Sequence, residues 1–73
     1  MLNKGEVLTL NDNKEYTVVY STEINFKKYA YLIELDNHSN MMLCEYNGNE
    51  LEEVLDHNII EEVIEKFNNS LIQ

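Results

Sequence analysis

The hydrophobic pattern of this chain changes its period near residue 55, and this change separates two kinds of structure. Before that point, apolar residues form short runs separated by clusters of asparagine, aspartate and glycine, which favour turns. These runs are rich in aromatic and β-branched side chains, which favour strands. They cover residues 7–10, 15–20, 29–35, 41–46 and 50–54. The pattern predicts a small antiparallel β-meander of four to five strands.

The strand pattern leaves one segment open between two conformations and fixes the faces of another. Residues 21–28 either extend the second strand or form a loop with Ile24 and Phe26 folded inward. The longest run has a period of two, which puts Tyr29, Tyr31, Ile33 and Leu35 on one face and Ala30, Leu32 and Glu34 on the other.

The dipeptide Asn47-Gly48 is a strong hairpin signal, because both central residues of a type I′ turn need positive φ. A two-residue Asn47-Gly48 loop places Glu45 opposite Glu50, and like charges across a ladder are unfavourable. A loop shifted by one residue pairs Tyr46 with Leu51, and Leu43 with Val54. The sequence predicts the hairpin and leaves both registers open.

Beyond residue 55, apolar residues recur at helical spacing, at Ile60, Val63, Ile64, Phe67 and Leu71. This stripe predicts an amphipathic helix over about residues 57–70. Asp56 is the expected N-cap, since it places Leu55 and Ile60 where they can form a hydrophobic staple. Asn58 is the rival cap, but it loses that staple.

These elements indicate an α+β fold, in which the helix covers a meander of the SH3-like half-barrel type. Seventy-three residues make a single domain over 1–73, with the meander at about 6–54. A sheet of short strands is marginal by itself, so we expect folding to require the helix.

The chain resembles short uncharacterised proteins of low-GC Gram-positive bacteria and their phages, of the domain of unknown function 1292 type. The similar segments are residues 4–10, 15–19, 29–32, 50–54 and 63–67. This resemblance implies a meander-plus-helix fold and an intracellular or phage setting. It implies no reaction and no catalytic residues.

Acidic residues dominate the charge and are concentrated in the last 29 residues. The net charge is −9, and residues 45–73 hold eight acids against one lysine. Binding to nucleic-acid phosphates or to an anionic membrane needs clustered cations, so we expect neither. A protein partner with a basic surface is the binding class that fits, whereas the simpler interpretation is that the charge maintains solubility. The sequence shows neither a secretory signal nor a long apolar run, and its one cysteine excludes an internal disulfide, so we expect a cytoplasmic protein of a bacterial host.

The candidate catalytic and metal-binding residues are few. Cys44 could act as a nucleophile with His38 or His57 as base, but nearby acids raise a thiol pKa, which favours a structural cysteine. These three residues with Asp36 lack the spacing of a known metal site. We therefore expect neither an enzyme nor a cofactor or metal. The five tyrosines lie on strands without interleaved cations, which favours core packing or a protein interface.

The function that these patterns favour is that of a non-enzymatic, acidic protein-binding module. Its most specific form is a phage or mobile-element inhibitor of a nucleic-acid-handling defence protein, similar in kind to an anti-CRISPR, whose carboxylates replace phosphates. The alternative is a structural homodimer or subunit that joins through a tyrosine-rich sheet face or an edge strand, and a small enzyme ranks third. The expected partner-binding residues are Glu50, Glu52, Glu53, Glu61, Glu62 and Glu65.

Overall fold

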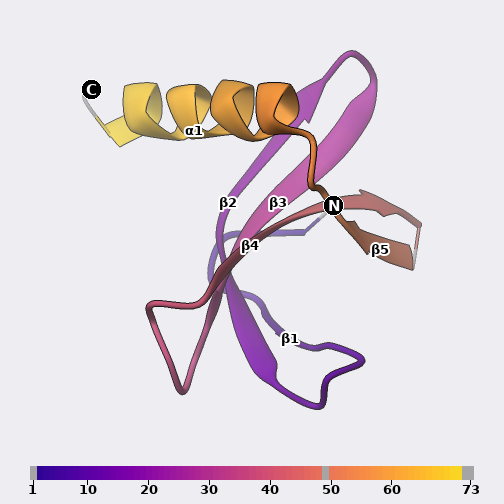
Figure 1. The fold of residues 1–73 in the computed structure, drawn as a ribbon, viewed down its shortest axis with the longest axis vertical. Coiled ribbons are helices and arrows are strands. Elements are labelled where there is room, and N and C mark those ends of the chain that lie inside the picture. The colour runs from indigo at the N-terminus through magenta and orange to yellow at the C-terminus, as the bar shows by residue number, and fades with distance from the viewer. Residues whose placement is uncertain (1, 49, 72–73) are drawn as a thin grey trace.

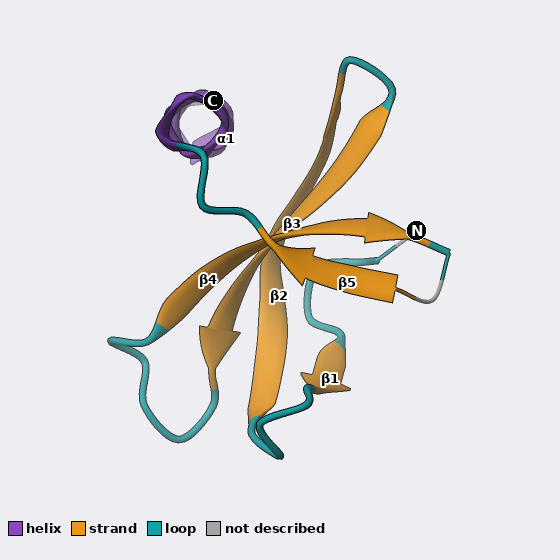
Figure 2. Cartoon of the chain, turned by 45° about the vertical axis from the view of Figure 1, so that its right-hand side comes forward, coloured by secondary structure: helices purple, strands orange, loops and turns teal. Residues whose placement is uncertain are grey.

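The computed structural model describes residues 2–48 and 50–71, and this part of the chain forms one sheet and one helix (Figure 1). The strands are β1 (Val7–Thr9), β2 (Glu15–Ile24), β3 (Lys27–Glu34), β4 (Met41–Asn47) and β5 (Glu50–Glu53). Each strand pairs antiparallel with the next along the chain. The sheet twists and curls into a half-barrel, and the helix α1 (His57–Leu71) lies to one side of it (Figure 2). The predicted α+β meander with one C-terminal helix is confirmed.

The inner face of the half-barrel holds the larger of two apolar clusters. All five strands contribute to this cluster, which identifies it as the interior of the curl. Leu8 and Leu51 from the two outermost strands cover its margins. Its buried members are Tyr16, Val18, Ala30, Leu32, Cys44 and Tyr46.

The second apolar cluster joins the opposite face of the sheet to α1. Tyr29 on β3 and Leu43 on β4 are buried there beside Val63, which is only 1% exposed. Ile59 and Ile60 of the helix pack at its margin. Because the central strands are covered on both faces, the helix forms part of the core and is not a peripheral element.

A β-bulge in β2 decides which face its tyrosines occupy. Val18 pairs with Leu32, but Tyr20 pairs with Tyr31, so Val19 is an extra residue without a partner in the ladder. A bulge reverses the alternation of the strand beyond it. Tyr20 therefore leaves the inner face, where Tyr16 and Val18 lie, and packs on the side of α1.

The β2–β3 connection settles the alternatives for residues 21–28. β2 continues to Ile24, and the two turn residues Asn25 and Phe26 have φ of 52° and 66°. Positive φ at both central positions is the geometry of a type I′ turn. The inward-folded loop is wrong for Phe26, which is 96% exposed because it occupies the tip of this hairpin.

The β4–β5 hairpin adopts the shifted register. Tyr46 pairs with Leu51, and Asn47 with Glu50, so the ladder continues to the last residue of β4 and the first of β5. The backbone N–H of Val54 donates to the carbonyl oxygen of Leu43 at 2.8 Å, which extends the same register. This register sets Leu51 beside Tyr46 on the inner face, but it still opposes two acids, because Glu45 lies opposite Glu52 instead of Glu50.

The predicted N-cap of α1 is confirmed, whereas the last residue of the predicted apolar stripe is not buried. The backbone N–H of Asn58 donates to Asp56 Oδ1 at 2.9 Å, and this bond identifies Asp56 as the N-cap. Leu55 remains 75% exposed, so a staple with Ile60 buries little surface. The prediction that Leu71 belongs to the buried stripe is wrong, since Leu71 is 64% exposed. Figure 1 shows the C-terminal end of α1 extending past the strands.

Candidate functional site

The six acids expected to bind a partner lie on two elements. Three occupy the edge strand β5 and three the helix α1, and all six are exposed: Glu50, Glu52, Glu53, Glu61, Glu62 and Glu65. The register of the sheet divides the first three between two faces, because successive residues of a strand point in opposite directions. The predicted set therefore does not form one surface in the way that the sequence suggested.

Glu52 has an acidic neighbour outside the six predicted partner-binding residues. The register places Glu52 directly opposite Glu45 of β4. Side chains at such positions lie about 5 Å apart at Cβ, so two carboxylates there repel each other. Glu45 is half-buried, which reduces the screening of this repulsion by water.

The pKa of Tyr29 is affected by a carboxylate of this pair and by carboxylates at the start of the helix. Burial raises the pKa of Tyr29, and the charges of Glu45, Glu62 and Asp56 raise it further, in that order. Glu45 is also the direct partner of Tyr29 in the β3–β4 ladder. We call Glu45, Glu52, Asp56 and Glu62 the acidic belt, which runs from β5 across β4 to the first turns of α1.

Within the described residues, no lysine forms an ion pair with the acidic belt, although Lys27 and Lys28 line one pocket with Glu45. The ion pair found there joins Lys14 to Glu34 at 3.9 Å and lies outside the belt. Lys66 is the sole lysine of residues 45–73, and it makes no ion pair with the belt. The belt thus carries an excess of negative charge, which attracts cationic groups from a partner.

Glu53 lies on the opposite face of β5, opposite the inward-facing Cys44. Burial raises the pKa of Cys44 to about 11, and the charge of Glu53 adds to this effect. A thiol with this pKa is protonated at neutral pH, which makes it a poor nucleophile. His38 in the β3–β4 loop and His57 at the start of α1 are both exposed, whereas Cys44 is 2% exposed.

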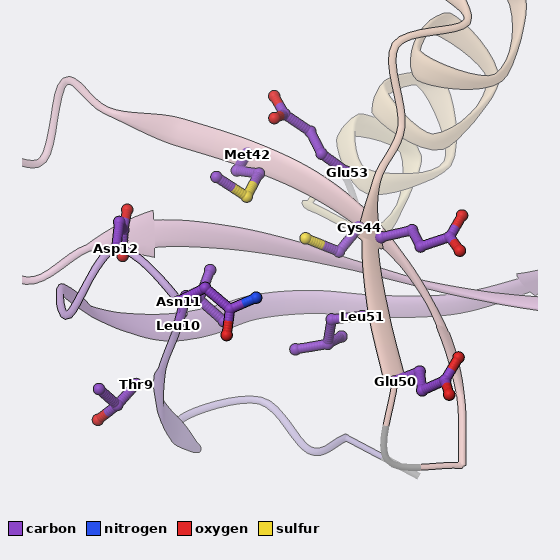
Figure 3. A pocket seen from close by; sticks show the side chains of 10 residues that line it. Thr9, Leu10, Asn11, Asp12, Met42, Cys44, Glu50, Leu51 and Glu53 are labelled. Carbon is purple, nitrogen blue, oxygen red and sulfur yellow. The ribbon is translucent and has the colours of Figure 1, made fainter.

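Glu53 and Cys44 line an open cleft at the end of the half-barrel (Figure 3). This cleft has a volume of about 680 Å³ and lies between the edge strand β5 and the segment that follows β1. We call it the edge cleft. It is lined by Thr9, Leu10, Asn11, Asp12, Met42, Cys44 and Glu50 to Glu53.

A second, smaller cavity lies between α1 and the sheet. No belt residue lines it, but Leu55 and Val63 of its wall are the chain neighbours of Asp56 and Glu62. Its volume is about 170 Å³, and its walls are mainly apolar, with Tyr31, Met41 and Ile64 among them. Met41 and Leu55 beside it are 46% and 75% exposed. The belt therefore borders an exposed apolar surface, which is a common composition for a protein-binding site.

The tyrosines that suggested a binding face are buried in the fold or packed against the helix. Tyr16, Tyr29 and Tyr46 are buried. Tyr20 and Tyr31 are half-buried against Phe67, with ring centroids 5.3 Å and 5.9 Å from its ring. The structure therefore offers no open tyrosine-rich face on the described residues.

No family model, no curated protein and no solved structure matches this chain. The resemblance to the domain of unknown function 1292 stays a prediction. Among the described residues, no group of three or more histidine, cysteine, aspartate or glutamate side chains is arranged to hold a metal. Nor does any helix there combine the length and the apolar character that crossing a bilayer requires.

Proposed function

We propose that this protein is a non-enzymatic module that binds a protein partner with a basic surface, and that the acidic belt carries this binding. The observation that supports the proposal most directly is the pairing of Glu45 and Glu52 across the β4–β5 ladder, beside Asp56 and Glu62, whose charges also raise the pKa of Tyr29. Glu52 extends this charge to the sheet edge.

Repulsion within the belt costs folding stability. Like charges directly opposite each other in a ladder destabilise a sheet, and glutamine at either position would remove the repulsion between Glu45 and Glu52. A basic partner relieves the same repulsion when it binds. The arrangement is therefore better suited to a bound state than to the free protein.

The more specific form of this proposal is an accessory inhibitor from a phage or mobile element. Such an inhibitor would occupy the basic site of a nucleic-acid-handling defence protein, in the manner of an anti-CRISPR. The spaced carboxylates of the belt would take the place of phosphates, and the adjoining apolar cavity would add contacts that phosphates do not provide. The net charge of −9 supports rapid, salt-sensitive association with such a site.

Affinity capture from the source cell at low and high salt tests this proposal. The belt variant Glu45→Gln/Glu52→Gln/Glu62→Gln removes three charges, and its matched control Glu15→Gln/Glu23→Gln/Asp36→Asn removes three exposed charges elsewhere. We expect the native protein and the control to retain the same basic partner at low salt, and the belt variant to lose it. Equal retention by both variants would refute the role of the belt.

A further inference from the structure

The sheet of this protein is open, and its two edges border the same cleft. β1 and β5 are the terminal strands of the sheet, and Thr9 at the end of β1, the turn after it and the whole of β5 line the edge cleft together. Between them, the cleft exposes the margin of the inner core, where Leu10, Met42 and Leu51 are only partly buried. A further strand at this position would continue the half-barrel and cover these side chains.

The backbone of both edges is available for pairing. β5 pairs only with β4, and β1 only with β2. In the described part of the chain, no backbone hydrogen bond outside these ladders involves residues 7–9 or 50–53. Alternate N–H and C=O groups of β5 therefore point away from β4 without a backbone partner, which is the template for strand addition.

The side chains of β5 alternate in a way that specifies the chemistry of an added strand. Leu51 lies on the inner face with the core, whereas Glu50 points away from it (Figure 3). Glu52 shares the face of Glu50, by the alternation of the strand. A segment beside β5 thus meets Leu51 and Met42 on its inward side, with Glu53 at the end of the strand, and the carboxylates of Glu50 and Glu52 on its outward side.

We propose that the edge cleft binds an extended segment of a protein partner, added as a strand to β5, in which lysine or arginine alternates with apolar residues. This inference rests on the proposed function, because it assigns a binding mode to the basic partner. The apolar side chains of the segment cover Leu51 and Met42, and its cations face Glu50 and Glu52. Asp12 and Glu53 at the rim of the cleft add further negative charge.

A second copy of this chain is the less suitable occupant. Pairing of two β5 edges would place the glutamates of one copy against those of the other, and each copy carries a net charge of −9. Charges on an exposed edge also protect a sheet against such self-association. Charge complementarity therefore selects a cationic strand.

A synthetic hexapeptide of alternating lysine and valine, blocked at both ends, is the probe. The first control peptide has the same composition with its three lysines before its three valines. The second has the alternating sequence with N-methyl groups on alternate backbone nitrogens, which removes the donors of a strand without changing charge. Binding to the full chain is measured by NMR titration, together with hydrogen exchange of the amides of residues 50–53.

We expect the alternating peptide to bind at least about tenfold more tightly than either control, since several backbone hydrogen bonds are lost or misaligned in the controls. It should slow amide exchange in β5. Glu50→Gln/Glu53→Gln should weaken its binding, whereas the matched control Glu61→Gln/Glu65→Gln, on the exposed face of α1, should not.

The outcomes separate this inference from the proposed function. Equal binding of all three peptides, or an unchanged exchange of the β5 amides, refutes strand addition and leaves salt-sensitive binding of cations by the acidic surface in place. Loss of binding in Glu45→Gln/Glu62→Gln, which leaves β5 intact, with the β5 variant unaffected, assigns the partner to the belt and also refutes strand addition. A chain that binds none of the peptides at low salt contradicts both proposals.

Discussion

The packing of Phe67 against the sheet allows the role of the helix to be tested by a single substitution. The Phe67 ring is tilted by 45° on Tyr20 and lies edge-on at 75° to Tyr31. Phe67→Ala removes both aromatic contacts and part of the apolar surface that α1 buries. Leu71→Ala is the matched control, because Leu71 belongs to the same helical stripe but is 64% exposed.

The expected loss for Phe67→Ala follows from these contacts. Each aromatic pair contributes about 0.5–1.5 kcal/mol, and burying half of the side chain contributes roughly 1 kcal/mol more. The sum is about 2–4 kcal/mol, against roughly 4–11 kcal/mol for a whole domain of this size. A small domain loses roughly 4–8 °C in Tm for each kcal/mol, so Tm should fall by roughly 10–30 °C. Leu71→Ala should change stability by less than about 0.5 kcal/mol.

Thermal unfolding followed by circular dichroism, together with urea unfolding, measures both quantities. Phe67→Leu should show an intermediate loss, because leucine retains apolar burial but not the contacts between rings. The reasoning fails if Phe67→Ala and Leu71→Ala have the same Tm within about 2 °C. Such a result would mean that α1 does not pack on Tyr20 and Tyr31.

Three further outcomes are expected. Phe26→Gly should raise Tm, because glycine adopts a φ of 66° without strain and the 96% exposed ring contributes no burial; a lower Tm in a thermal melt would contradict this. Glu52→Gln should increase the free energy of unfolding by about 0.3 kcal/mol in low salt, by removing repulsion from Glu45. The gain should fade in urea unfolding at high salt, and a gain that persists there would exclude electrostatic repulsion as its cause. Burial raises the pKa of Cys44 from its ordinary value of 9.0 to about 11, so the unfolded chain loses this proton first as the pH rises. The stability that the neutral thiol provides is therefore present below pH 9 and is lost between pH 9 and about 11. Cys44→Ala should make the decline of stability in this interval shallower, and an identical pH profile would show that Cys44 does not titrate there.

The elements that the sequence predicts correctly depend on short-range chemistry. The cap at Asp56 requires a side-chain oxygen within reach of the next N–H groups, and the helical stripe requires only a period of 3.6. The alternation in β3 also follows from local geometry, and it places Tyr29 and Ala30 on opposite faces. Such features are set by neighbours along the chain.

The residues of the candidate site could be predicted from the sequence less completely than the fold. Charge counting located the acids in the last third of the chain, but it could not separate Glu52 from Glu53 or select Glu45. The two registers that the turn permits differ by two residues, so they leave each β5 side chain on the same face and change only which glutamate lies opposite Glu45. An Asn47-Gly48 loop puts Glu50 there, whereas the observed register puts Glu52 there, so counting the pairs on from Tyr46 and Leu51 was the signal that could have found the pair of Glu45 and Glu52.

The sequence by itself thus determined an acidic amphipathic helix, its start and a meander of short strands. Only the tertiary structure decided that the bulge at Val19 turns Tyr20 toward Phe67, that Leu71 stays largely exposed and that both sheet edges border one cleft. Periodicity and capping arise from contacts a few residues apart, which any short segment carries with it. Register, burial and edge exposure arise from contacts between distant segments, and these exist only once the whole chain has folded.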